Sequence, residues 1–286
     1  MAPGSLRRSG RRLAPALLLA VMGAASLALY VVPPQRHRLE FQLQNFDYGI
    51  LYHASGRIAA GRDGFMTVRG VEILADNQEY LLWLLAPLHW LPHTAVLLLL
   101  LHSLALWSCG AIAAALTWRR DALVALALAA FAWWSPFLAN MSLDLVHVEA
   151  FAAPLLLLVY AAWAAGRPIA AALALALALA CKEDVAISGA ALMGVLAWRP
   201  ASERAPGRRA AAAGVLACAL VLALNLGVVL PAAKRATCAR LDPGVAATRL
   251  VESPEPVSPY FRDVLGGLGR PGFWRERLGR PEAGAV

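Results

Sequence analysis

The sequence predicts an all-α integral membrane protein with about seven transmembrane helices. Of its 286 residues, 60% are hydrophobic and only 15% are charged, a composition far from that of a soluble domain. Apolar segments recur along the chain, and several approach the roughly 20 residues that a helix needs to cross hydrocarbon. The arginines of the short loops all fall at one end of these segments, which is the pattern of cytoplasmic loops in membrane proteins.

The first expected span covers residues 13–32, behind a basic cytoplasmic N-terminus of residues 1–12. A signal peptide with its basic n-region is the alternative. However, the apolar run is long for the core of a signal peptide, and residues 33–38 hold prolines and arginines rather than a cleavage site. We therefore expect an uncleaved membrane anchor.

The loop after the first span is expected to carry a short helix. A single helix over residues 80–118 would be roughly 58 Å long, which is too long for one crossing. Pro87 and Pro92 divide this stretch, because proline interrupts a helix. We expect an interfacial helix over residues 79–91 and a true span over residues 93–118.

The remaining spans follow the alternation of apolar runs and short loops. The full set of expected spans is residues 13–32, 93–118, 121–138, 150–165, 168–180, 185–198 and 210–231, within a polytopic membrane domain of residues 13–232 that has an outer loop at 33–92. The two short apolar halves that flank Lys182 are also consistent with a re-entrant hairpin, which would leave the later topology unchanged. Residues 233–286 form a tail rich in Arg, Pro and Gly, without a further span.

The basic residues also predict the orientation and the partners. Arginines gather at residues 7–12, 119–120, 167 and 199–209, on one side of the predicted bilayer. We therefore expect a multi-pass protein of the plasma (inner) membrane with a cytoplasmic N-terminus. The net charge of +8 then reflects membrane topology rather than nucleic-acid binding, and the lipid bilayer is the expected partner.

Most acidic and histidine-containing clusters fall at the opposite, outer end of the spans, which predicts one polar site there. Asp47 lies in an aromatic segment, where its carboxylate can take a proton from an attacking hydroxyl or bind a divalent cation; a helix N-cap is an equally good interpretation. His147 and Glu149 follow Asp144 between two spans. A carboxylate there can orient the imidazole, or both can belong to a metal site, and a solvated turn is the alternative.

Lys182, Glu183 and Asp184 are three consecutive charges between apolar runs. No loop residues carry them into water, so we expect them to line a cavity in which Lys182 is available to an anionic phosphate. Other polar residues are interpreted structurally. His102 and the other histidines of the spans and outer loop are expected to be interhelical or interfacial, and residues 77–79 to cap the short helix.

Four strings of residues carry a resemblance to a known family. They are Phe-Asp-Tyr-Gly-Ile at 46–50, Leu-Trp-Leu-Leu-Ala-Pro-Leu-His-Trp-Leu-Pro at 82–92, His-Val-Glu-Ala at 147–150 and Lys-Glu-Asp-Val-Ala at 182–186. In order and spacing, roughly residues 45–232 resemble an uncharacterised prokaryotic membrane family, domain of unknown function 2079. The chain departs from the family pattern at Asn77, where the pattern has histidine, and at Val148, where it has proline.

The resemblance implies an architecture similar to that of the GT-C glycosyltransferases. These enzymes take a sugar from a polyprenyl-phosphate donor at the outer membrane face and carry an acidic residue in the first outer loop. Asp47 matches that position and is the expected catalytic residue, with a divalent metal as a possible cofactor. The expected substrate-binding residues are His147, Glu149, Lys182, Glu183 and Asp184.

Two other classes of function remain open at this point. The same charges can serve a transporter or a lipid-flipping protein as a pathway for an ion or a headgroup. Members of the family are generally longer, so residues 233–286 are expected to be a truncated or diverged outer domain. An inactive family member is therefore the third alternative.

Overall fold

The computed structural model describes residues 4–40, 46–66, 70–143, 146–198 and 206–240, and this part of the chain is almost entirely helical. Its only strands are the two-residue β1 (Phe65–Met66) and β2 (Val71–Glu72), which pair in antiparallel orientation. The α-helices are α1 (Gly4–Leu39), α2 (Phe46–Ala59), α3 (Ile73–Asp76), α4 (Leu81–Leu85), α5 (Thr94–Thr117), α6 (Ala122–Trp133), α7 (Pro136–Leu143), α8 (Ala152–Ala164), α9 (Pro168–Leu179), α10 (Val185–Trp198), α11 (Arg208–Leu224) and α12 (Leu230–Arg240). Single 3₁₀ segments, η1 (Ala86–Trp90) and η2 (Val148–Phe151), precede α5 and α8, and a π-helical turn, η3 (Asn225–Val229), joins α11 to α12. The prediction of an all-α membrane protein is confirmed.

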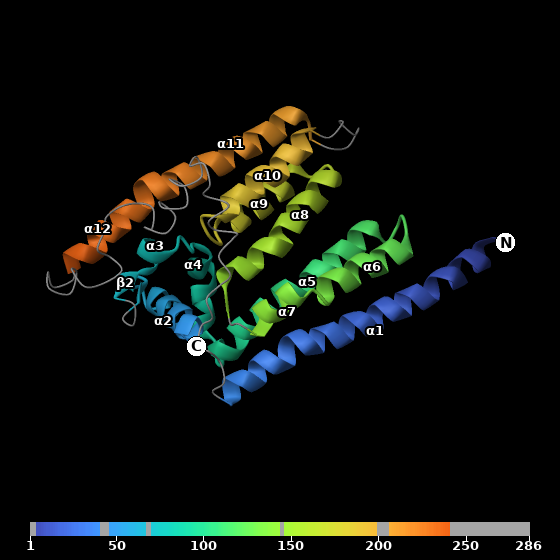
Figure 1. The fold of residues 1–286 in the computed structure, drawn as a ribbon, viewed down its shortest axis with the longest axis horizontal. Helices are drawn as coiled ribbons and strands as arrows, with labels where there is room; N and C mark the ends of the chain where they lie inside the picture. The colour runs from blue at the N-terminus through green and yellow to red at the C-terminus, as the bar shows by residue number, and fades with distance from the viewer. Residues whose placement is uncertain (1–3, 41–45, 67–69, 144–145, 199–205, 241–286) are drawn as a thin grey trace, which may run out of the picture.

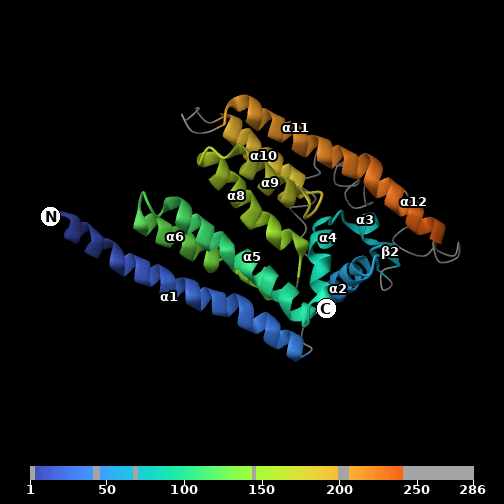
Figure 2. The same cartoon turned by 180° about the vertical axis from the view of Figure 1, so that it is seen from behind.

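The long helices lie side by side in one bundle (Figures 1 and 2). Helix α1 packs on α5 and α6 at one edge, α8 packs on α5 and α9 in the middle, and α10 packs on α11 at the other edge. The elements α2, β1, β2, α3, α4 and η1, which we call the loop layer, gather at one end of this bundle beside α12. The expected short helix is found in this layer as α4 followed by η1.

Three helical segments of the described chain are long and apolar enough to cross a membrane: Leu13–Leu39, Thr94–Thr117 and Arg208–Thr237. Helices α6 and α7 meet at an angle of 43° and make a fourth if they form one broken span. The apolar helices α8, α9 and α10 are shorter than the roughly 20 residues of a full crossing. The count of seven spans therefore stays a prediction.

Prolines and one cap explain where several helices begin. Pro136 opens α7 directly after the bend, because a proline lacks the amide hydrogen that would continue α6. Pro168 stands in the first turn of α9, where a missing amide hydrogen costs nothing. At the start of α6, the Asp121 carboxylate accepts hydrogen bonds from the amides of Leu123 and Val124, at 2.8 and 3.2 Å.

Two tryptophans join α1, α5 and α6 in a contact that we call the tryptophan seam (Gly23, Trp107, Gly110, Trp133). The rings of Trp107 and Trp133 stack with centroids 5.7 Å apart. Each indole N–H donates to a backbone carbonyl, that of Trp107 to Gly23 at 2.9 Å and that of Trp133 to Trp107 at 2.8 Å. A Cβ atom on Gly110 would meet Trp133 Nε1 at 2.4 Å, so only glycine lets the ring approach this backbone.

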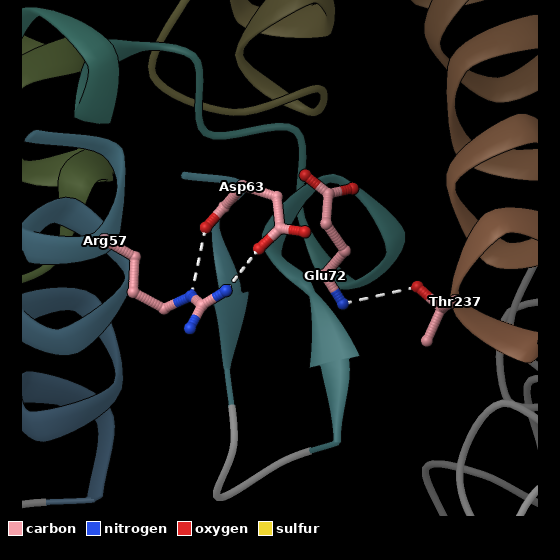
Figure 3. A network of polar contacts seen from close by, with 4 residues as sticks. All are labelled: Arg57, Asp63, Glu72 and Thr237. Carbon is pink, nitrogen blue, oxygen red and sulfur yellow. Dashed lines mark hydrogen bonds and ion pairs between the residues drawn. The ribbon is translucent and has the colours of Figure 1, made fainter. Parts of the chain in front are cut away.

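Polar contacts at the far edge hold the loop layer together and fasten it to the bundle, as shown in Figure 3. Arg57 at the end of α2 donates to the backbone oxygen of Asp63 and forms an ion pair of 2.6 Å with its carboxylate. The amide of Glu72 in β2 donates to the buried hydroxyl of Thr237 in α12, at 3.3 Å. Helix α12 therefore extends the last long helix of the bundle into the loop layer and holds β2 and α3 in place.

Candidate functional site

Lys182 and Glu149 form an ion pair at the end of the bundle that the loop layer covers. Lys182 lies in the turn between α9 and α10, and Glu149 lies in η2 at the start of α8. The Lys182 ammonium donates to Glu149 Oε1 at 2.5 Å, with about a quarter of each side chain exposed (24% and 26%). The two segments are 33 residues apart in sequence, so the fold, and not local geometry, brings these charges together.

The pairing overcomes the effect of burial on both groups. Burial alone would raise the pKa of the Glu149 carboxyl, but the hydrogen bond from Lys182, a backbone hydrogen bond and the nearby charges of Lys182 and His147 together outweigh it, and the pKa is lowered. Burial alone would lower the pKa of the Lys182 ammonium, but the hydrogen bond to Glu149 and the charges of the neighbouring carboxylates together raise it. Both groups are therefore charged at neutral pH, and the Lys182 cation is already paired with Glu149.

His147 joins the pair from the other side of Glu149. Its backbone is extended (φ −104°, ψ 131°) directly before η2. His147 Nδ1 lies 3.9 Å from Glu149 Oε2, an electrostatic contact rather than a hydrogen bond. Of the predicted site residues, the structure thus brings His147, Glu149 and Lys182 into one cluster.

Glu183 and Asp184 point to different surroundings. Glu183 Oε2 accepts a hydrogen bond from the backbone amide of Gln78 at 3.1 Å, next to a backbone bond of 2.8 Å from Leu81 to Ala180. Glu183 therefore fastens the loop layer onto the α9–α10 turn. Asp184 is exposed and, with Glu149, lines a cavity of about 270 Å³ between α7, α8 and α10.

Glu79 belongs to the cluster although the sequence pattern predicted a helix cap for residues 77–79. That prediction was wrong, because α4 begins without a side-chain cap and the Glu79 side chain is buried, with 4% exposed. Burial is the main reason that the pKa of its carboxyl is raised to about 8, with the charge of Glu149 adding to the effect and that of Lys182 opposing it. The polar string from Asp76 to Glu79 was visible in the sequence, but the burial of Glu79 was not.

His102 is a second residue whose position the sequence did not reveal. It lies in α5, fully buried, and neither ring nitrogen has a hydrogen-bond partner. Its electrostatic neighbours are His147 and Glu149, so it adjoins the cluster from the side of the bundle interior. The signal available in the sequence was a histidine within the long apolar run of the second predicted span.

The predicted catalytic residue, Asp47, is the second residue of α2, but its side chain lies outside the described part of the structure, as does Asp144. Its neighbour Tyr48 is described and donates from its hydroxyl to the backbone oxygen of Ala95, at 3.1 Å. This bond docks the first turn of α2 on the first turn of α5. Burial raises the pKa of the Tyr48 hydroxyl to about 12, so that it stays protonated.

The described residues do not assemble a metal site. No three of their His, Cys, Asp and Glu side chains come together in a group that could hold a metal ion. The described part of the cluster therefore consists of one ion pair, two histidines and additional carboxyl groups. Such a set can bind a charged headgroup, accept protons or donate them.

The comparisons with known proteins agree with the fold. The profile of a family described as a predicted membrane protein family, DUF2079, matches residues 36–245. No curated protein and no solved structure matches the chain. The match covers α2 through α12, and therefore the bundle apart from most of α1, the loop layer and every residue of the cluster. Because it also spans well over half of the chain, the protein belongs to this family of predicted membrane proteins, domain of unknown function 2079.

Proposed function

We propose that the protein is a membrane glycosyltransferase that takes a sugar from a polyprenyl-phosphate donor at the extracytoplasmic face. The observation that supports this function is the meeting of Lys182, Glu149 and His147, from two separate loops, at one end of an apolar bundle. A cation, a carboxylate and an imidazole are the groups that a departing phosphate and an attacking hydroxyl require. Ionisable groups in membrane helix bundles usually serve function rather than stability.

The proposed reaction assigns a role to each predicted residue. An acceptor hydroxyl oxygen attacks the sugar carbon, the bond from that carbon to the phosphate oxygen breaks, and its electron pair stays on the phosphate. Asp47 takes the hydroxyl proton, as the resemblance to GT-C enzymes implies, and Lys182 neutralises the departing phosphate. Because Glu149 holds Lys182 in this structure, the phosphate competes with the Glu149 carboxylate for the ammonium.

A large apolar cavity next to the cluster supports a lipid-linked substrate. It has a volume of about 810 Å³ and lies between α9 and α11. One end is bounded by Leu179 and Ala180, which Cys181 separates from Lys182, and by Tyr80, whose hydroxyl donates to Asn225 Oδ1 at 2.7 Å. A hydrocarbon chain in this cavity would place its phosphate end near the α9–α10 turn. No step is assigned to a metal, since the described side chains do not form a metal site.

The proposal is tested by transfer from a polyprenyl-phosphate sugar to a soluble acceptor, with the full chain in lipid vesicles. Asp47→Asn keeps the shape of the side chain but removes the base, so we expect a loss of roughly 10²-fold or more. Lys182→Met should weaken retention of the phosphorylated lipid. Glu40→Gln is the matched control, because Glu40 is an exposed carboxylate outside the cluster, paired with Arg36.

Two results would contradict the proposal. Normal transfer by Asp47→Asn would remove Asp47 from the mechanism. Passage of the intact lipid-linked sugar across the vesicle membrane, without transfer by the wild-type chain, would instead indicate a lipid-flipping protein.

A further inference from the structure

Several buried polar atoms around the Lys182–Glu149 pair have no hydrogen-bond partner. They are Gln78 Oε1, Glu79 Oε2, Glu149 Oε2 and both ring nitrogens of His102. The exposed fractions are 0% for Gln78, 4% for Glu79 and 0% for His102. Since buried polar atoms in folded proteins nearly always bond to protein, water or ligand, this group indicates an occupant at the centre of the cluster.

Packing and electrostatics place His102, Glu79 and Glu149 close to one another. His102 lies on α5 between Leu99, which shares a hydrophobic cluster with Val148 of η2, and Leu106, which shares another with Ala150, and α5 packs against η2. The histidine therefore faces η2, the segment that carries Glu149, and Glu149 is one of its electrostatic neighbours.

Glu79 adjoins the same region from the loop layer. The charged groups that face its carboxyl are Glu149, Lys182, Asp76 and Glu183. Those that face His102 are His147 and Glu149. Glu149 is common to both sets, so Glu79 and His102 both lie near it. Lys182 is the single basic side chain among the groups facing Glu79, against three other carboxylates.

The unpartnered atoms define what the occupant must do. Gln78 Oε1 and an ionised Glu149 Oε2 only accept hydrogen bonds, and a neutral imidazole offers one donor and one acceptor. The occupant must therefore donate several hydrogen bonds. The excess of carboxylates favours positive charge as well, and water that carries an exchangeable proton has both properties.

We propose that Gln78, Glu79, Glu149 and His102 enclose a hydrated proton-binding site, in which Glu79 carries the exchangeable proton. When the proton leaves, the O–H bond of the Glu79 carboxyl breaks, the electron pair stays on Oε2, and the proton passes to the enclosed water. Neutral His102 accepts a hydrogen bond from enclosed water at one ring nitrogen and donates one to a second water at the other. The site does not depend on glycosyl transfer.

Burial of Glu79 agrees with this role. A carboxyl whose pKa is raised to about 8 is protonated at neutral pH and releases its proton in mildly alkaline medium. An exposed glutamate would already be ionised near pH 5. The exchange therefore falls in a pH range where few other carboxyl groups titrate.

Infrared spectroscopy of the full chain in lipid vesicles tests the site directly. Between pH 5 and 10, the C=O band of a protonated carboxylic acid should persist through neutral pH and disappear around pH 8 in the wild type. Glu79→Gln should lack that band, and Glu40→Gln, which alters an exposed carboxylate, should keep it. A wild type without a protonated carboxyl above pH 6, or an unchanged band in Glu79→Gln, would overturn the proposal.

A second pair of variants tests whether His102 belongs to the proposed hydrated site, which we call the chamber (Gln78, Glu79, His102, Glu149). His102→Leu replaces the imidazole with an apolar side chain of similar size and should exclude water, so the titration of Glu79 should move upward by roughly 0.5–1 pH unit. His102→Gln keeps hydrogen-bonding atoms and should move it less. Equal titration of Glu79 in the wild type and in His102→Leu would show that the two residues do not share water and would overturn the common site.

Discussion

The two halves of helix α5 differ in whether their buried polar atoms have hydrogen-bond partners. Toward its C-terminal end, Trp107 and Gly110 take part in the tryptophan seam, where both indole N–H groups have carbonyl partners. Toward its N-terminal end, His102 is equally inaccessible to solvent but has no partner for either nitrogen. Within a few turns, one helix therefore carries a packing contact whose indole N–H groups both have hydrogen-bond partners and a histidine of the polar chamber whose ring nitrogens have none.

The difference indicates which half is built for stability and which for function. In a membrane, apolar surface adds little to helix association, so close contacts at small residues such as Gly23 and Gly110 are the main means of holding helices together. The N-terminal half of α5, with His102, lowers the stability of the fold unless water or a ligand forms hydrogen bonds with its buried polar atoms. We expect mutations in the tryptophan seam to act on folding, and mutations around Glu149 to act on charge and binding.

The largest effect is expected from Gly110→Leu. Its side chain would enter the space of Trp133, whose ring is held by stacking and by a hydrogen bond, so the helices must separate at a cost of roughly 3 kcal/mol or more. Thermal unfolding in detergent, followed by tryptophan fluorescence, measures the loss. Gly194→Leu is the control, because a Cβ there meets nothing within 4 Å. Equal melting temperatures of the two variants would contradict the assignment of the seam to stability.

The next effect is expected from the ion pair. Lys182→Met leaves the Glu149 carboxylate without its cation, which should cost roughly 1–3 kcal/mol because three quarters of each side chain is covered. The double variant Lys182→Met with Glu149→Gln removes the stranded charge and should recover most of the loss. Thermal unfolding of the single and double variants forms a double-mutant cycle. A cycle without coupling would show that the pair is incidental.

A smaller effect is expected from pH. Burial raises the pKa of the Glu79 carboxyl to about 8 in the folded chain, above the roughly 4.5 of an unfolded glutamate. Between these values the folded state binds more protons than the unfolded state, so stability is greatest below the lower value and falls as pH rises toward 8. The slope should be about 1 kcal/mol per pH unit and should be absent in Glu79→Gln. Melting temperatures of both proteins from pH 5 to 8 measure it, and parallel curves would contradict it.

Composition and the arrangement of arginines were sufficient to predict an all-α membrane protein, because hydrocarbon permits few other structures for such apolar segments. The sequence also indicated that His147, Glu149 and Lys182 belong to one site, since charges beside apolar runs must share a polar environment. The ion pair between Lys182 and Glu149 could not be predicted from the sequence. Lys182 was expected to be available to phosphate, and only the packing of η2 against the α9–α10 turn explains its bond to Glu149.

The chamber was missed for a related reason. The local sequence pattern predicted a helix cap for residues 77–79 and interhelical packing for His102. Residues of these types commonly have those structural roles at such positions. Burial of Glu79 depends on the bond from Gln78 to Glu183, more than 100 residues away along the chain. Contacts of this range are set by the tertiary fold, so no local motif reports them.

The smallest effect is expected from cysteine labelling, which should alter neither stability nor charge but decides which side of the membrane the chamber faces. Trp90 in η1 is 74% exposed at the chamber end of the bundle, and Arg208 at the start of α11 is exposed at the opposite end (Figure 1). The arginine asymmetry predicts that Trp90→Cys reacts with an impermeant thiol reagent in intact cells, whereas Arg208→Cys reacts only after permeabilisation. Cys109, Cys181 and Cys218 are buried, so Cys238→Ser gives a suitable background. The reverse labelling pattern would place the chamber on the cytoplasmic side. An extracytoplasmic sugar donor could not then reach Lys182, which would contradict the proposed glycosyl transfer. The proton site on Glu79 would remain, but it would exchange protons with the cytoplasm.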